Sequence, residues 1–162
     1  MILEQHNIPP VFDGQCKTLI LGSFPSVKSR EAEFFYAHPQ NRFWRVLADV
    51  FCEIPPLSTA EKTAFLLAHH IALWDVIASC DIAGSSDSSI RNVVPNDLTR
   101  ILSVAPVERI LCNGTTAYGL YMKYSFSQTG VPAVKLPSTS AANASFSLSR
   151  LSGLWRAALL PV

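Results

Sequence analysis

The sequence has little charge and no long hydrophobic run. Only 15% of its 162 residues are charged and 49% are hydrophobic, a composition that excludes a disordered chain and suits one domain spanning residues 1–162. The longest apolar runs, such as residues 19–21 and 71–74, are far shorter than the ~20 residues of a membrane span. Residues 1–10 lack the basic start and apolar stretch of a signal peptide. We therefore expect a cytoplasmic protein that does not enter a membrane.

Metal and cofactor motifs are missing too. The four cysteines, Cys16, Cys52, Cys80 and Cys112, form no Cys-x-x-Cys pair, and no histidine lies near one at ligand spacing. The stretch Gly22-Ser-Phe-Pro-Ser26 has one glycine and no Gly-Lys-Ser/Thr ending, so it is not a phosphate-binding loop. No Gly-x-Ser-x-Gly hydrolase motif is present. We expect reduced structural thiols, no metal and no organic cofactor.

The net charge of +1 gives no signal for nucleic acid over the whole chain. Residues 17–45 are locally more basic, with five basic residues (Lys17, Lys28, Arg30, Arg42, Arg45) against two acids (Glu31, Glu33). This excess fits either a phosphate-facing patch or an ordinary solvated surface.

Short apolar segments alternate with amphipathic ones along the chain. The pattern predicts strands at residues 17–22, 71–77, 109–113 and 132–136, and helices at 41–51, 58–69, 96–104, 114–124 and 146–160. Residues 23–39, 79–89 and 137–145 have the composition of loops. This alternation indicates an α/β fold, a three-layer α/β/α arrangement with a central four-stranded parallel sheet.

Ligands of such sheets bind beyond the carboxyl ends of the strands. That rule selects three segments, residues 22–41, 113–116 and 137–145. The first begins with Gly22, where the backbone can approach a ligand closely, and it carries Phe24 and Tyr36, whose rings are suited to stacking on a base.

Two of these segments resemble a known family. The run Tyr36-Ala-His-Pro-Gln-Asn-Arg-Phe-Trp44, after a strand that ends at Gly22, resembles the first-motif region of mismatch-specific uracil-DNA glycosylases. The loop Leu136-Pro-Ser-Thr-Ser-Ala-Ala-Asn143 is similar to the superfamily's second motif, which inserts into DNA. Gly-Ser-Phe-Pro-Ser and Pro-Ser-Thr-Ser resemble most closely the hypoxanthine-DNA glycosylase branch. The resemblance implies a monomeric base-excision repair enzyme that flips a deaminated base out of DNA and needs no cofactor.

The chain departs from the superfamily pattern in both motifs. Uracil-excising members carry Asp or Asn in the first motif to position water, where this chain has Ser23-Phe24. Ser138 stands where many members have His or Asn, and Ala141, Ala142 and Asn143 replace the wedge leucine. These departures favour hypoxanthine over uracil as the substrate. A uracil or mismatch glycosylase, a catalytically inactive lesion binder and an unrelated doubly wound enzyme remain as alternatives.

Asn41 is the principal catalytic candidate, because the resemblance implies that the asparagine after His-Pro carries much of the catalysis. An amide can orient water or donate a hydrogen bond to the leaving base. Asparagine before a helical run is also a common N-cap, and both roles can coexist. Ser23 is the second catalytic candidate by its place in the motif. Asp75, at a strand end, is either a water-positioning carboxylate or a local cap.

The remaining candidates divide into two groups, each with an ordinary structural role as the alternative. Base-binding candidates are Phe24, Tyr36, His38, Asn113 and Ser138. DNA-binding candidates are Ser26, Lys28, Arg42, Thr139, Ser140 and Asn143. Serine at these positions also suits turns, and Asn113 could cap the helix that follows it. The matched motifs contain no lysine for a Schiff base, so we expect a monofunctional enzyme that uses water.

Overall fold

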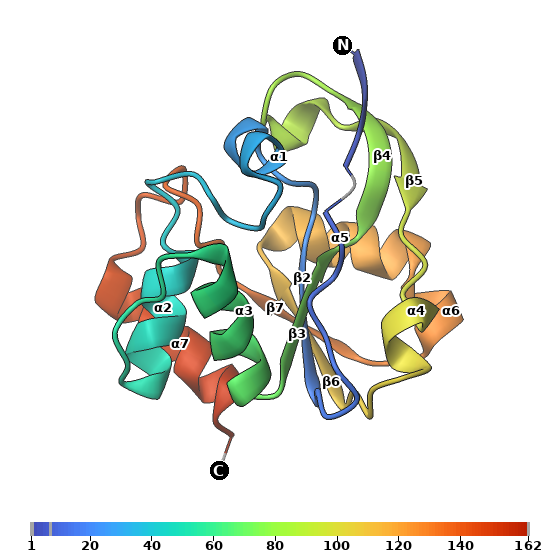
Figure 1. The fold of residues 1–162 in the computed structure, drawn as a ribbon. Helices are drawn as coiled ribbons and strands as arrows, with labels where there is room; N and C mark the ends of the chain where they lie inside the picture. The colour runs from blue at the N-terminus through green and yellow to red at the C-terminus, as the bar shows by residue number, and fades with distance from the viewer. Residues whose placement is uncertain (1, 7, 162) are drawn as a thin grey trace.

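The central feature of the protein is a four-stranded parallel sheet (Figure 1). A computed structural model describes residues 2–6 and 8–161. The strands lie in the order β3 (Ile71–Asp75), β2 (Thr18–Gly22), β6 (Arg109–Asn113) and β7 (Ala133–Leu136). Every residue of β2 and β3 is buried, as the continuous apolar runs predict for strands covered on both faces. The predicted α/β class and the parallel sheet are confirmed.

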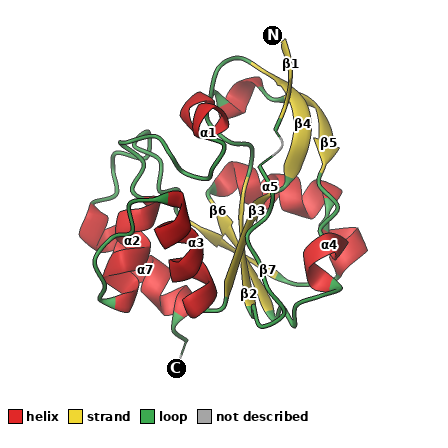
Figure 2. Ribbon diagram, viewed as in Figure 1, coloured by secondary structure: helices red, strands yellow, loops and turns green. Residues whose placement is uncertain are grey.

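Helices cover both faces of this sheet (Figure 2). On one side lie α2 (Phe43–Phe51), α3 (Thr59–Ala68) and α7 (Leu148–Leu159), and on the other lie α4 (Thr99–Leu102), α5 (Thr115–Tyr124) and α6 (Phe126–Thr129). The predicted helix over residues 96–104 is much shorter in the structure, and the turn α6 was not predicted. The three-layer arrangement holds.

The core joins the sheet to the helices through large aromatic side chains. Phe43 and Trp155 are almost completely buried and meet edge to face, with ring centroids 6.0 Å apart. The indole N–H of Trp155 donates to the carbonyl oxygen of Pro137, 3.0 Å away. This bond ties helix α7 to the start of the loop at residues 137–145, which borders the site described below.

A second, antiparallel sheet was not predicted. Its strands are β1 (Ile2–Gln5), β4 (Ile77–Ile82) and β5 (Arg91–Pro95), in the order β1-β4-β5. The prediction of one strand over residues 71–77 followed by a loop from 79 is therefore wrong. Along β4 only Ala78 and Asp81 are not fully buried and the buried positions include polar Ser79, while β5 is a mostly exposed edge strand that contains Asn and ends in Pro, so neither strand has a strong apolar pattern.

The segment after β2 also differs from the prediction. Residues 23–39 were expected to be a loop, but α1 (Val27–Ala32) forms within them. Ser26 is its N-cap and accepts a hydrogen bond from the backbone N–H of Ser29. The Ser29 hydroxyl in turn accepts from the N–H of Ala37, 3.0 Å away, which holds the chain that leads to Asn41.

All four cysteines are free thiols, as predicted, and Cys16, Cys80 and Cys112 are buried. Among the described helices, none is both long and apolar enough to cross a membrane.

Candidate active site

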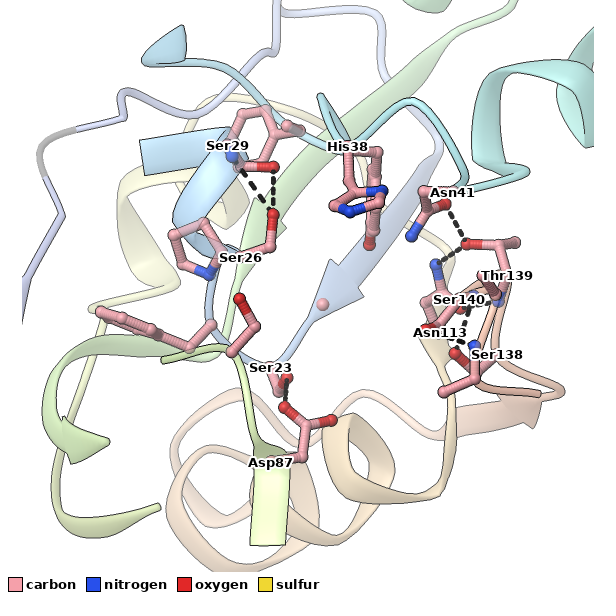
Figure 3. Close-up of a pocket in the computed structure, with 18 of the residues that line it drawn as sticks. Ser23, Ser26, Ser29, His38, Asn41, Asp87, Asn113, Ser138, Thr139 and Ser140 are labelled. Atoms are coloured by element: carbon pink, nitrogen blue, oxygen red, sulfur yellow. Dashed lines mark hydrogen bonds between the residues drawn. The ribbon is translucent and has the colours of Figure 1, made fainter. Parts of the chain in front are cut away.

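A cavity of about 420 Å³ opens at the carboxyl edge of the parallel sheet. The ends of three neighbouring strands meet there, at Gly22, Asp75 and Asn113. The chain after β2 and the loop after β7 form its walls (Figure 3). This is the edge that the topology predicts for a ligand site, and the volume is within the range of small-ligand pockets.

Gly22 forms part of the cavity floor, and the side chains of Asp75 and Tyr36 pack closely over it. A Cβ atom at Gly22 would lie 2.4 Å from Asp75 Oδ1 and 2.9 Å from the Tyr36 hydroxyl. Only a residue without a side chain leaves room for this arrangement. The Tyr36 backbone adopts a left-handed conformation, φ 52°, and its ring stacks on Phe43 with centroids 4.0 Å apart. One ring face of Tyr36 is thereby covered, and Tyr36 also lines the cavity.

Asp75 is 3% exposed, and its Oδ2 atom has no hydrogen-bond partner among the described residues. The nearest basic group is His6, whose Nε2 atom lies 3.8 Å from Oδ2. Burial raises the pKa of Asp75 from 3.8 to about 7, with a smaller contribution from the negative charge of Asp87. Burial also lowers the pKa of His6 and raises that of the Tyr36 phenol. The floor therefore holds a carboxyl group that titrates near neutral pH and a phenol that stays protonated there.

Asn41 is held by two hydrogen bonds to its side-chain oxygen. Oδ1 accepts from the backbone N–H of Phe43 and from the Thr139 hydroxyl, each 2.9 Å away. Since the backbone N–H can only donate, the oxygen and nitrogen of this amide are assigned without ambiguity. The Asn41 amide nitrogen is left facing the cavity (Figure 3).

Asn113 on β6 completes the same network. Its Oδ1 accepts from the backbone N–H of Thr139 and its Nδ2 donates to the Thr139 hydroxyl, both at 3.0 Å. Thr139 is fully buried between the two asparagines. One buried threonine therefore links the first-motif segment, strand β6 and the loop after β7.

Arg42 fastens this loop from the other side. Its guanidinium donates to the backbone carbonyl oxygens of Ser140, Asn143 and Phe146. Asn143 also donates from Nδ2 to the carbonyl oxygen of Ser138. These bonds hold residues 138–143 against the start of helix α2.

His38 and Ser23 line the cavity from the segment that follows β2. His38 Nδ1 accepts from the backbone N–H of Gln40, 3.1 Å away, so in the neutral ring Nε2 carries the proton. Ser23 donates from its hydroxyl to Oδ1 of Asp87, 3.2 Å away. Asp87 begins η1 (Asp87–Ser89), a turn in the connection between β4 and β5. Among the described residues, no group of three or more His, Cys, Asp or Glu side chains could hold a metal ion.

The family model that matches this chain is the uracil DNA glycosylase superfamily, over residues 9–158. The match includes both walls of the cavity. The chain belongs to the uracil DNA glycosylase superfamily. It is therefore a DNA glycosylase, a hydrolase of N-glycosyl bonds whose substrate is DNA.

Named relatives agree with this assignment. A Methanosarcina acetivorans protein named hypoxanthine DNA glycosylase is 32% identical over 147 residues, covering 90% of this chain and 92% of the relative. A Methanosarcina barkeri protein of the same name is 31% identical over 114 residues, covering 69% and 72%. A solution NMR structure from M. acetivorans, described as a candidate uracil DNA glycosylase, has a TM-score of 0.81 and 32% identity. That alignment covers 98% of this chain and 97% of the other.

The glycosylase brings most of the candidate residues together. Both catalytic candidates, Asn41 and Ser23, line the cavity. All five base-binding candidates and three of the DNA-binding candidates also line it (Phe24, Tyr36, His38, Asn113, Ser138, Ser26, Thr139, Ser140). Lys28 lies outside it on the exposed face of α1, where it pairs with Glu31. Arg42 and Asn143 hold the rim loop from outside the cavity.

Three candidates have positions that differ from the prediction. Thr139 is 0% exposed and has no surface through which to contact DNA. The guanidinium of Arg42 is occupied by backbone carbonyl oxygens, so it organises the loop that was expected to meet DNA. Phe24 is 8% exposed, and its ring packs under the second sheet with His6 at 5.3 Å and the Arg30 guanidinium over it. Its ring is therefore not free to stack on a base, which leaves Tyr36.

Asp75 and Asp87 line the cavity and His6 lies beside Asp75, although none of the three belongs to either motif. Asp75 was an open alternative on the basis of its strand end, and it lines the floor. Asp87 was missed, since its Ser-rich surroundings (residues 84–89) look like an ordinary loop. His6 was missed because it follows β1, a four-residue strand with no regular apolar pattern. No sequence signal connects Asp87 or His6 to the motifs; only the second sheet brings them there.

The first prediction concerns the close packing over Gly22. Replacing Gly22 with Ala forces Asp75 and Tyr36 apart, which we expect to cost about 1–3 kcal/mol of stability and to abolish excision. Gly119→Ala is the matched control, since a Cβ there meets nothing within 4 Å on an exposed helical site. The control should gain about 0.5–1 kcal/mol. Denaturant unfolding measures both, and equal responses of the two variants would refute the packing argument.

The second prediction follows from the raised pKa of Asp75. A buried acid with a folded pKa near 7 and an unfolded pKa near 4 stabilises the fold at low pH. That stabilisation is lost as pH rises from 4 to 7, at up to about 1.4 kcal/mol per pH unit. Asp75→Asn does not titrate, so its melting temperature should rise relative to the parent between pH 5 and pH 8. Melting curves of both proteins that shift in parallel over this range would contradict the raised pKa.

Proposed function

We propose that this glycosylase removes hypoxanthine from DNA by hydrolysis, as a monofunctional enzyme acting on a base flipped into the cavity. Asn41 is the residue on which the proposal chiefly depends. Its oxygen is saturated by Phe43 and Thr139, and its amide nitrogen faces the cavity. The group is therefore a fixed donor, suited to the negative charge that develops on a departing base.

The floor of the cavity suits a planar base with a carbonyl group. Phe43 covers one face of the Tyr36 ring, and Tyr36 lines the cavity, so we infer that its second face is the stacking surface for the base. Asp75 lines the cavity, and its raised pKa favours a protonated carboxyl group that can donate to a carbonyl oxygen such as O6 of hypoxanthine. Adenine has an amino group there instead of an acceptor, so the same contact would disfavour the undamaged base. Deamination is the change that such a site detects.

Three observations support the choice of hypoxanthine over uracil. The relatives above that are named hypoxanthine DNA glycosylase match most of the chain. The first motif holds Ser23 in place of the acid or amide of uracil-excising members. A cavity of about 420 Å³ has room for a purine.

Water is the expected nucleophile. Among the described residues that line the cavity there is no lysine, so no amine is present to form a Schiff base with the sugar. Lesion selection is assisted by base pairing, because flipping costs less for a mispaired deaminated base than for a paired one. We expect a monomer to carry out the reaction.

A panel of duplexes, each with one lesion, tests the substrate. We expect release of hypoxanthine from deoxyinosine duplexes, no strand cleavage before alkali, and much slower release of uracil. Robust uracil release without hypoxanthine release would replace the proposal with a uracil or mismatch enzyme. Tight lesion binding without release of any base would indicate an inactive binder.

The third prediction concerns Asn41 itself. Asn41→Ala should lower single-turnover excision of hypoxanthine about 100- to 1,000-fold, the loss typical of a transition-state donor. Affinity for lesion DNA should change little, because the lost contact matters most when the bond breaks. Gln128→Ala, which removes an exposed amide on α6 outside the cavity, is the control. Unchanged excision by Asn41→Ala would exclude the assigned role.

A further inference from the structure

The cavity contains a carboxylate that the motifs do not supply. Asp87 comes from the connection between β4 and β5 in the second sheet, and it meets Ser23 at the end of β2. One of its oxygens, Oδ1, accepts from the Ser23 hydroxyl, and both residues line the cavity (Figure 3). We propose that Asp87 is a catalytic residue, which holds the attacking water and accepts its proton.

A proton acceptor is needed because Asn41 and His38, which also line the cavity, cannot supply one. The only oxygen of the Asn41 side chain already accepts two hydrogen bonds, which leaves its N–H₂ group to act as a donor. His38 uses Nδ1 to accept from Gln40 and can offer only Nε2–H in its neutral form. Neither residue can take a proton from water in this arrangement. The water therefore requires an acceptor elsewhere in the cavity.

Two acids are present among the described residues that line the cavity, Asp75 and Asp87. They occupy different environments. Asp75 lies buried on the floor, and among the described residues none donates a hydrogen bond to its carboxyl group, since Nε2 of the neighbouring His6 is bonded to the carbonyl oxygen of Ile77. Asp87 lies in an exposed turn with its carboxyl group partly buried, and it receives a hydrogen bond from Ser23, which favours its charged form.

This difference separates the roles of the two acids. Burial raises the pKa of both carboxyl groups, and the Ser23 hydrogen bond counteracts the rise for Asp87. The charge of Asp87 further raises the pKa of Asp75. With both groups in one cavity, the more buried Asp75 favours its protonated form and Asp87 its charged form, a division that suits one donor and one base.

The reaction step balances with water as the only co-reactant. The bond between C1′ and the base nitrogen breaks, and its electron pair leaves with the base. The water oxygen bonds to C1′ while one of its protons moves to the Asp87 carboxylate, which later releases it to solvent. The leaving base takes up one proton from solvent, which balances the proton that Asp87 releases. The negative charge of Asp87 also stabilises the positive charge that develops on the sugar.

This inference rests on the proposed function, and it adds a residue from outside both family-like motifs. The departure of Ser23 from the usual acid or amide then acquires a physical explanation. The serine supplies the hydroxyl that positions a carboxylate delivered by the second sheet. In this proposal the Asp87 carboxylate binds water as the first-motif acid does in uracil-excising members, but it comes from a different part of the chain.

The fourth prediction uses Asp87→Asn, which keeps an acceptor oxygen for Ser23 and removes the charge. Single-turnover excision of the lesion that the parent enzyme releases should fall about 100- to 10,000-fold. Affinity for lesion DNA should stay equal or increase, because a negative charge near phosphates has been removed. Asp87→Glu, which retains the carboxylate, should keep more activity than Asp87→Asn.

The matched control is Asp81→Asn on the neighbouring strand β4, where the carboxylate bonds to Asn92 outside the cavity. It should excise at the parent rate. Melting curves of each variant separate a loss of chemistry from a loss of folding. Parent-like excision by Asp87→Asn, or equal losses in Asp87→Asn and Asp87→Glu, would overturn the inference. If the parent enzyme releases no base at all, the proposed function fails first, and the two failures are thereby distinguished.

Discussion

The site depends on the hydrogen bonds of one buried hydroxyl. Thr139 accepts from Asn113 and donates to Asn41, while its own N–H donates to Asn113. Three segments far apart in the chain are joined at this point, the first-motif segment, the end of β6 and the loop after β7. A buried polar network of this kind is stable only when each member is satisfied, so it specifies one arrangement of the walls. The Asn41 amide is thereby fixed before DNA arrives, which is the condition that the proposed electrostatic role requires.

The protonation of the cavity is the second constraint. Two carboxyl groups share one cavity, and their mutual repulsion and unequal burial favour a single negative charge. The acid on the floor is suited to recognition and the acid at the side to chemistry. Gly22 makes the floor possible, because its missing side chain admits both Asp75 and Tyr36. Recognition, chemistry and packing thus meet at the end of a single strand, β2.

Much of this could be predicted from the sequence. The parallel sheet followed from short apolar runs that alternate with helical ones, and its carboxyl edge located Gly22, Asn41 and Asn113. The second sheet could not be predicted, because β4 mixes polar with apolar residues without regular alternation and β5 is a short exposed edge. Asp87 was missed with it, since only tertiary structure brings a Ser-rich turn to Ser23. Arg42 and Thr139 were assigned to DNA because their types suit phosphates, but unpaired backbone carbonyls and a buried amide use them first.

We propose that Thr139 affects the rate of excision through its hydrogen bond to Asn41. A double-mutant cycle of single-turnover hypoxanthine excision, with Thr139→Val and Asn41→Ala alone and combined, measures that dependence directly. We expect Thr139→Val to slow excision by the parent enzyme but to produce no further loss once Asn41 is alanine. Losses that multiply independently in the double variant would show that the two residues act separately, and would contradict it.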